Sequence, residues 1–155
     1  MLPITEGTEA PLFSAPDQNG NLIELSQFKG KKVVLYFYPK DDTPGCTAQA
    51  CNLRDNHSEL LNKGIQVIGI SVDSVKSHKK FETKYQLPFP LIADEEKTIV
   101  AAYNVWGEKK FMGKTYMGTS RTTFLIDEQG IIQKIITKPD TKNHAAEVLA
   151  AWDLA

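Results

Sequence analysis

Residues 33–51 read VVLYFY, then PKDDTPG, then CTAQAC, and this stretch decides the fold class. The first six residues form a continuous apolar, β-branched and aromatic run, which is typical of a strand buried on both faces. Pro39 ends the run, and a polar loop leads to Pro44, where a helix can begin. A buried strand that passes through a loop into a helix predicts an α/β domain.

The rest of the chain continues this alternation of strands and helices. We expect one domain over residues 1–155, an arrangement of the thioredoxin-like kind, although other three-layer α/β domains fit the same pattern. A central mixed sheet would carry helices on both faces and antiparallel strands on one side. After an irregular start over 1–21 with a hairpin turn at 17–20, the pattern predicts strands at 22–25, 65–72, 91–93, 122–127 and 131–137, helices at 45–63, 75–85, 95–103 and 145–152, and a loop or irregular strand at 106–117.

The composition excludes several classes of protein. The chain has 155 residues, 41% of them hydrophobic, which allows a real core, and a formal net charge of -1, which argues against a nucleic-acid binder. No apolar run approaches the roughly 18 residues of a membrane span. The first residues show neither a basic nor an apolar signal region, so we expect a cytoplasmic protein. Two cysteines are too few for a disulfide scaffold.

Cys46 falls in the first turn of the expected helix, with Thr43 as N-cap and Pro44 at the first helical position. The helix dipole and the unpaired backbone N–H groups there favour a thiolate. A fast thiol enzyme also needs hydrogen-bond donors, which the Thr43 hydroxyl, the backbone N–H groups of Gly45 and Cys46, and an arginine could supply. The chain holds only two arginines, Arg54 and Arg121.

The residues alone leave simpler interpretations open. Cys46 could be a buried structural cysteine, since free cysteine is among the most buried residue types. Thr43 could be only a helix cap, Pro39 only a strand terminator, and Arg121 only a surface or ion-pairing residue.

Cys51 lies five residues after Cys46. In an ideal helix this spacing places the two Cα atoms roughly 8.6 Å apart, whereas a disulfide needs about 4.4–6.8 Å. Either the pair never bonds or the first helical turns unwind. We expect no metal site, because the three histidines are at unhelpful spacings, and the Cys-x-x-Cys motif of disulfide carriers is absent.

The pattern Pro39-x-x-x-Thr43-x-x-Cys46 resembles the active-site motif of the peroxiredoxins. Residues 38–51, together with WGEKKFMGK at 106–114 and RTTFLID at 121–127, look like the peroxiredoxin Q branch, also called bacterioferritin comigratory protein. This resemblance covers nearly the whole chain and implies a thioredoxin fold and a thiol peroxidase without cofactor or metal.

The resemblance also implies roles for individual residues. Cys46 matches the peroxidatic cysteine and Cys51 the resolving cysteine of this branch. Thr43 and Arg121 match the residues that orient the peroxide and stabilise the thiolate, and Pro39 matches the proline that shields the site. Gln49 stands where several other branches carry glutamate.

The expected function is reduction of hydrogen peroxide and organic hydroperoxides. Cys46 would form a sulfenic acid, Cys51 would condense with it, and thioredoxin or a similar dithiol would reduce the disulfide. We expect a monomer with no nucleic-acid or membrane partner. A thiol–disulfide transferase or redox sensor with little peroxidase turnover is the alternative, followed by a binding domain whose cysteines are fortuitous.

Overall fold

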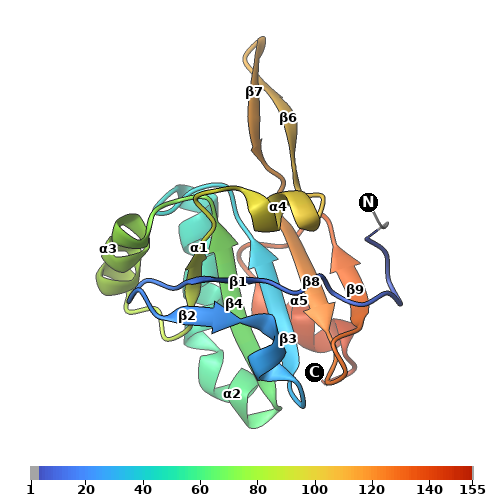
Figure 1. Ribbon diagram of the computed structural model, residues 1–155. Helices are drawn as coiled ribbons and strands as arrows, with labels where there is room; N and C mark the ends of the chain where they lie inside the picture. The colour runs from blue at the N-terminus through green and yellow to red at the C-terminus, as the bar shows by residue number, and fades with distance from the viewer. Residues whose placement is uncertain (1–3, 155) are drawn as a thin grey trace.

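The computed structural model describes residues 4–154 and contains the predicted mixed sheet. Its strand order is β5-β4-β3-β8-β9, with β3 at the centre (Figure 1). β3 pairs in parallel with β4 on one side and antiparallel with β8 on the other. The expected antiparallel side is therefore confirmed. The strands are β3 (Lys32–Phe37), β4 (Ile65–Ser71), β5 (Leu91–Ala93), β8 (Thr122–Ile126) and β9 (Ile132–Ile136).

Alternate residues of β3 enter two separate cores, one on each face of the sheet. Val34 and Tyr36 pack in the first core, and Val33, Leu35 and Phe37 in the second. The first face is covered by α1, α2, α3 and α5, and the second by η1 and α4. These helices are α1 (Pro44–Asp55), α2 (His57–Asn62), α3 (Val75–Tyr85), α4 (Thr98–Ala102), α5 (His144–Ala151) and the short 3-10 helix η1 (Leu25–Phe28).

The N-terminal segment forms the predicted hairpin. β1 (Ser14–Pro16) pairs antiparallel with β2 (Leu22–Glu24) around the expected turn. The prediction that Leu25 belongs to the second strand is wrong, because Leu25 begins η1. The expected irregular start of the chain includes residues 1–3, which lie outside the described residues.

The single helix predicted over 45–63 is wrong, because the chain forms α1 and α2 with a break at Asn56. The Asn56 side chain donates from Nδ2 to the carbonyl of Asn52 at 2.8 Å. A side chain that bonds the carbonyl four residues back competes with the backbone ladder, which explains the break.

The helix predicted over 95–103 is shorter than expected. Lys97 adopts a left-handed conformation with φ of 63°, so the helix starts only after it. Asp94 Oδ2 then accepts the backbone N–H groups of Ile99 and Val100 at 3.0 and 2.9 Å. This carboxylate satisfies the start of α4 from outside the helix.

The N-cap residues of α1, α3 and α5 differ in what their side chains do. Ser74 Oγ accepts the backbone N–H of Ser77 at 3.0 Å, as an N-cap should. Thr43 and Asn143 also occupy N-cap positions, but their side chains make no capping hydrogen bond.

Residues 106–119 form a regular two-stranded hairpin, so the expectation of a loop or irregular strand is wrong. β6 (Trp106–Phe111) and β7 (Lys114–Thr119) pair in full register and project away from the sheet (Figure 1). Met112 and Gly113 both have positive φ, 51° and 78°, which suits a tight two-residue hairpin turn. Among residues 4–154, no helix combines the length and the apolar character that crossing a membrane would require.

Candidate active site

The loop after β3 delivers Cys46 to the start of α1. The backbone N–H of Tyr38 still bonds the carbonyl of Ile70 at 3.1 Å, so the loop leaves the sheet at a fixed point. Pro44 begins α1, as predicted, and Cys46 lies in its first turn with 1% of its surface exposed. The unpaired N–H groups of that turn favour negative charge on the sulfur.

Arg121 lies beside this cysteine, although it comes from a distant part of the chain. Its Nη2 donates to Cys46 Sγ at 3.3 Å, and its Nη1 donates to Gln49 Oε1 at 2.8 Å. The pairing of Thr122 with Phe37 across β8 and β3 brings Arg121 to the loop end of the sheet. A guanidinium in this place stabilises a thiolate.

Gly45 provides the space that Arg121 occupies. A Cβ at position 45 would lie 3.1 Å from Arg121 Nη2, closer than ordinary van der Waals contact. The glycine of the motif therefore has a packing reason, which the sequence alone did not indicate.

The Thr43 hydroxyl makes a different bond from the one expected. Instead of capping α1 or offering its proton at the site, it donates to the carbonyl of Lys40 at 2.9 Å. Its oxygen keeps free lone pairs and can accept a hydrogen bond. The expected donor is thus positioned as an acceptor.

Two buried polar atoms next to this site lack a partner among the described residues. They are the Tyr36 hydroxyl and Gln49 Nε2. Tyr36 stacks on Tyr38 with ring centroids 5.4 Å apart. Burial, and next the neighbouring Cys46, raise the pKa of Tyr36 well above its ordinary value, so the hydroxyl keeps its proton.

Cys51 lies in the same helix as Cys46, and both thiols are free. Cys51 is half-buried, whereas Cys46 is buried. The helix that contains both is unbroken between them, so the geometric obstacle expected from the spacing is present.

Pro39 is exposed at the beginning of the loop. Its role as a shield of the sulfur stays a prediction.

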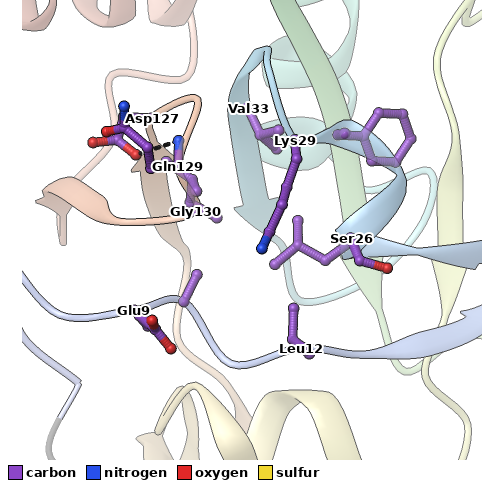
Figure 2. A pocket seen from close by; sticks show the side chains of 12 residues that line it. Glu9, Leu12, Ser26, Lys29, Val33, Asp127, Gln129 and Gly130 are labelled. Carbon is purple, nitrogen blue, oxygen red and sulfur yellow. Dashed lines mark hydrogen bonds between the residues drawn. The ribbon is translucent and has the colours of Figure 1, made fainter.

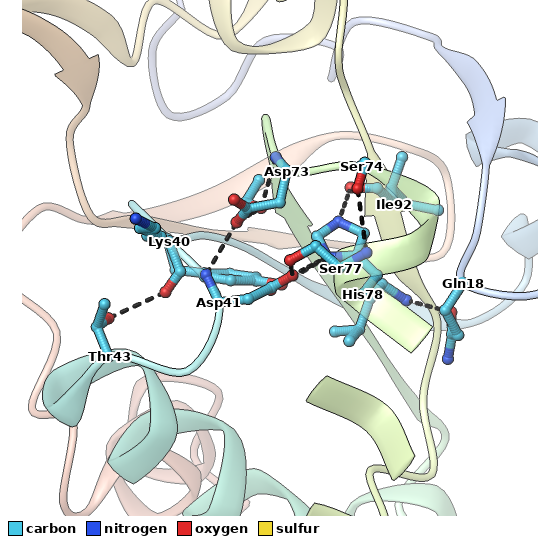
Figure 3. Close-up of polar contacts among 12 residues, drawn as sticks. Gln18, Lys40, Asp41, Thr43, Asp73, Ser74, Ser77, His78 and Ile92 are labelled. Atoms are coloured by element: carbon cyan, nitrogen blue, oxygen red, sulfur yellow. Dashed lines mark hydrogen bonds and ion pairs between the residues drawn. The ribbon is translucent and has the colours of Figure 1, made fainter. Parts of the chain in front are cut away.

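The structure adds contacts to the loop that the sequence analysis missed. Asp42 has a positive φ of 57°, and its carboxylate accepts from Lys84 Nζ and the Tyr85 hydroxyl, both at 2.8 Å. The hydrogen bond from Lys84 is the main cause that lowers the pKa of Asp42. Asp41 is buried and faces α3 as well (Figure 3). The two successive aspartates before Thr43 were a visible signal, but their partners on α3 are 36 to 43 residues away in the sequence.

A pocket elsewhere on the molecule is separate from this site (Figure 2). Its lining includes Val33 from the start of β3 and Ile126 from the end of β8. Cys46 and Arg121 lie near the opposite ends of these strands, and none of the five predicted site residues lines the pocket.

Comparisons with known proteins agree with the geometry. Residues 7–135 match the model of the AhpC/TSA family. The chain is 48% identical to peroxiredoxin Bcp of Escherichia coli, with 96% of each chain covered, and 46% identical to peroxiredoxin Bcp of Bacillus subtilis, with 92% and 91% covered.

Solved structures show the same fold. A mutant of Xylella fastidiosa PrxQ has a TM-score of 0.91 at 29% identity and covers 99% of this chain and 98% of its own. The bacterioferritin comigratory protein of Xanthomonas campestris, described for its alkyl peroxide reduction activity, has a TM-score of 0.85 at 35% identity, with 91% and 90% covered. The chain therefore belongs to the AhpC/TSA family, in the Bcp branch of the peroxiredoxins, which are thiol-dependent peroxidases.

Proposed function

We propose that the protein reduces hydrogen peroxide and organic hydroperoxides through Cys46, with Cys51 as the resolving cysteine. The observation that carries this proposal is the contact between Arg121 Nη2 and Cys46 Sγ at 3.3 Å. It places a fixed positive charge at a sulfur in the first turn of a helix. The attack of a thiolate on a peroxide needs such a positive charge, because negative charge moves from the sulfur to the leaving oxygen during the reaction.

In the first step the Cys46 thiolate attacks one oxygen of the peroxide. The S–O bond forms as the O–O bond breaks, which gives a sulfenic acid and an alkoxide or hydroxide that takes up a proton. Arg121 can donate to the peroxide oxygens while Nη1 remains on Gln49. The Thr43 oxygen can accept from the peroxide O–H, since its own proton is bonded to Lys40. Pro39 would limit the access of water.

In the second step the Cys51 thiol condenses with the sulfenic acid, which forms the disulfide and releases water. Because both cysteines lie in α1, the first turns of this helix have to unwind. A dithiol, for which we propose thioredoxin, then reduces the disulfide by exchange.

We further propose that the chain acts as one domain over residues 1–155, as a cytoplasmic monomer. Both reacting cysteines belong to one helix of one chain, so resolution needs no second copy. In support of a single domain, the N-terminal segment is hydrogen-bonded to the edge strand β9, where the Gly7 N–H donates to the carbonyl of Ile132 at 2.7 Å. The net charge of -1 gives no reason to propose a nucleic-acid partner. Light scattering on the purified chain tests the monomer.

The decisive experiment is peroxide consumption in steady state with NADPH, thioredoxin reductase and thioredoxin. Cys46→Ser should abolish consumption. Cys51→Ser should consume one equivalent of peroxide and then stall with thioredoxin. Full activity of Cys46→Ser would refute the assignment, and a wild type that exchanges disulfides but does not turn over peroxide would favour the transferase or sensor.

A further inference from the structure

The peptide group between Lys40 and Asp41 is held on both of its sides. Its carbonyl oxygen accepts the Thr43 hydroxyl at 2.9 Å, and its N–H donates to Asp73 Oδ2 at 2.8 Å (Figure 3). Both groups belong to one rigid plane, so a rotation of the N–H also turns the carbonyl. The acceptor on Asp73 therefore sets the direction of the bond that orients Thr43.

Asp73 is itself fixed to the sheet. Ser71, the last residue of β4, is buried and donates from Oγ to the same Asp73 Oδ2 at 2.7 Å. Ser71 Oγ also accepts the backbone N–H of Asp73 at 3.2 Å. One bond holds the Asp73 carboxylate and the other holds its backbone, so the residue is fixed to the end of β4.

The Asp41 side chain is anchored from the opposite direction, to α3 and β5. Its carboxylate accepts from the Tyr38 hydroxyl at 2.6 Å, from Ser77 Oγ at 2.8 Å and faces His78 Nδ1 at 2.7 Å. His78 Nε2 faces the carbonyl of Ile92 at 2.9 Å. Both ring nitrogens thus have an oxygen partner, so the ring is fixed between the Asp41 carboxylate and β5.

A metal ion is not needed to explain this cluster. Asp41, Asp73 and His78 bring ligand-type atoms within 4.8 Å of one another. Asp41 Oδ2, Asp73 Oδ2 and both ring nitrogens of His78, however, each have a hydrogen-bond partner in the protein. The cluster is a hydrogen-bonded support for the loop.

We propose that Asp73 is a positioning residue for peroxide reduction, which acts through the Lys40–Asp41 peptide to hold the Thr43 oxygen as an acceptor for the peroxide O–H. The inference rests on the proposed function. Without Asp73 the peptide can turn, the carbonyl of Lys40 moves, and the Thr43 hydroxyl is free to rotate. A hydroxyl that rotates presents its oxygen to the peroxide only part of the time, so the attack of Cys46 is slower.

The test compares two rate constants of reduced Cys46, measured by stopped flow in a Cys51→Ser background. One is for hydrogen peroxide and the other for iodoacetamide, whose reaction with sulfur uses no O–O bond. Asp73→Ala removes the acceptor, whereas Asp73→Asn keeps a carbonyl oxygen in the same place. Asp127→Ala is the matched control, because Asp127 accepts backbone N–H groups of Gln129 and Ile131, both at 2.9 Å, far from Cys46.

We expect Asp73→Ala to lower the peroxide constant about tenfold, equivalent to about 1.4 kcal/mol, and to change the iodoacetamide constant less than about twofold. Asp73→Asn should recover most of the loss, and Asp127→Ala should leave the peroxide constant unchanged. In a Thr43→Val background, Asp73→Ala should have no further effect, since its route to the peroxide is gone. If Asp73→Ala does not fold, Ser71→Ala replaces it in the same set of measurements, because it removes the hydrogen bond that holds the Asp73 side chain.

Three results would overturn the inference. They are an unchanged peroxide constant in the folded variant, an equal loss in both rate constants, and a full additional loss in the Thr43→Val background. A wild type that does not react with peroxide at all would instead refute the proposed function, so the two failures are distinguishable.

Discussion

Arg121 Nη2 lies 3.3 Å from Cys46 Sγ, although 75 residues separate the two in the sequence. The same guanidinium holds Gln49 Oε1 with its other terminal nitrogen. One planar group thus links the Cys46 sulfur to the buried side chain of Gln49, about one helical turn further along α1. A lysine would bring the charge but not the two diverging donors.

We therefore predict that Arg121→Lys lowers the rate constant for hydrogen peroxide by about ten- to a hundredfold, the range expected for loss of a charged hydrogen bond. Stopped-flow measurements on the reduced protein check this. Arg54→Lys is the control, because Arg54 bonds the carbonyl of Tyr85 and not Cys46. Equal rates for Arg121→Lys and wild type would show that charge alone is sufficient.

Gly45→Ala should make the protein less active. Alanine is favoured over glycine by about 1 kcal/mol in a helix interior, but Gly45 lies in the first turn of α1, and a Cβ there would lie 3.1 Å from Arg121 Nη2, which opposes any gain in stability. The guanidinium would have to move away by a few tenths of an ångström, which weakens its contact with Cys46. Urea unfolding and peroxide kinetics on the same sample measure the two effects, and an unchanged rate constant would contradict the packing role of Gly45.

Asn52 should limit how far α1 unwinds when Cys46 and Cys51 form a disulfide. Its Nδ2 donates to the carbonyl of Lys142, and its Oδ1 accepts the backbone N–H of Ala145, at 2.9 and 2.8 Å. Both bonds tie α1 to the start of α5 immediately after Cys51. On disulfide formation we expect faster amide hydrogen exchange over residues 43–51 and little change beyond.

Asn52→Ala should extend this faster exchange towards Asn56 and destabilise the reduced protein by about 1–3 kcal/mol, because it leaves the backbone N–H of the buried Ala145 unbonded. Exchange measured by mass spectrometry on reduced and oxidised protein tests both parts. Unchanged protection over 43–51 after oxidation would rule out local unwinding.

Local patterns allowed a large part of the fold to be predicted. The helix at 75–85 and the strand at 91–93 have the predicted first and last residues. Their boundaries are marked by neighbouring residues in the sequence, Ser74 before the helix and the prolines at 88 and 90 before the strand. The break at Asn56 was missed because it depends on which carbonyl one side chain selects. The hairpin at 106–119 was missed because it is largely exposed, so its strands show no buried alternation.

The candidate site was less predictable from the residues alone. The position of Cys46 follows from Pro44 and the helix start, which are local. The approach of Arg121 depends on the pairing of β3 with β8, and without the family resemblance this residue would have been interpreted as a surface arginine. The partners of Asp41 on α3 could not be found either, because no pattern within the loop specifies them.

Acid should destabilise the protein through His144. Burial is the main cause that lowers the pKa of His144, and the hydrogen bond with Glu147 opposes it in part. The folded protein therefore keeps this ring neutral while the unfolded chain takes up a proton below about pH 6.5, so stability is full above that pH and falls below it.

Urea unfolding at about pH 7.5 and about pH 5.5 should show a smaller loss for His144→Gln than for wild type. Burial also lowers the pKa of His57, with the same sign, so the difference between the two proteins isolates His144. An identical pH dependence for the variant and the wild type would contradict this assignment.

The contacts of His144 favour one neutral tautomer. His144 Nε2 faces the Thr123 hydroxyl at 2.9 Å, which can donate, and its Nδ1 faces Glu147 at 2.8 Å, so a neutral ring with its proton on Nδ1 satisfies both contacts. In long-range ¹H–¹⁵N spectra at neutral pH, we therefore expect His144 to show two unlike nitrogens, with the proton on Nδ1. A proton on Nε2 alone, or on both nitrogens, would contradict this assignment.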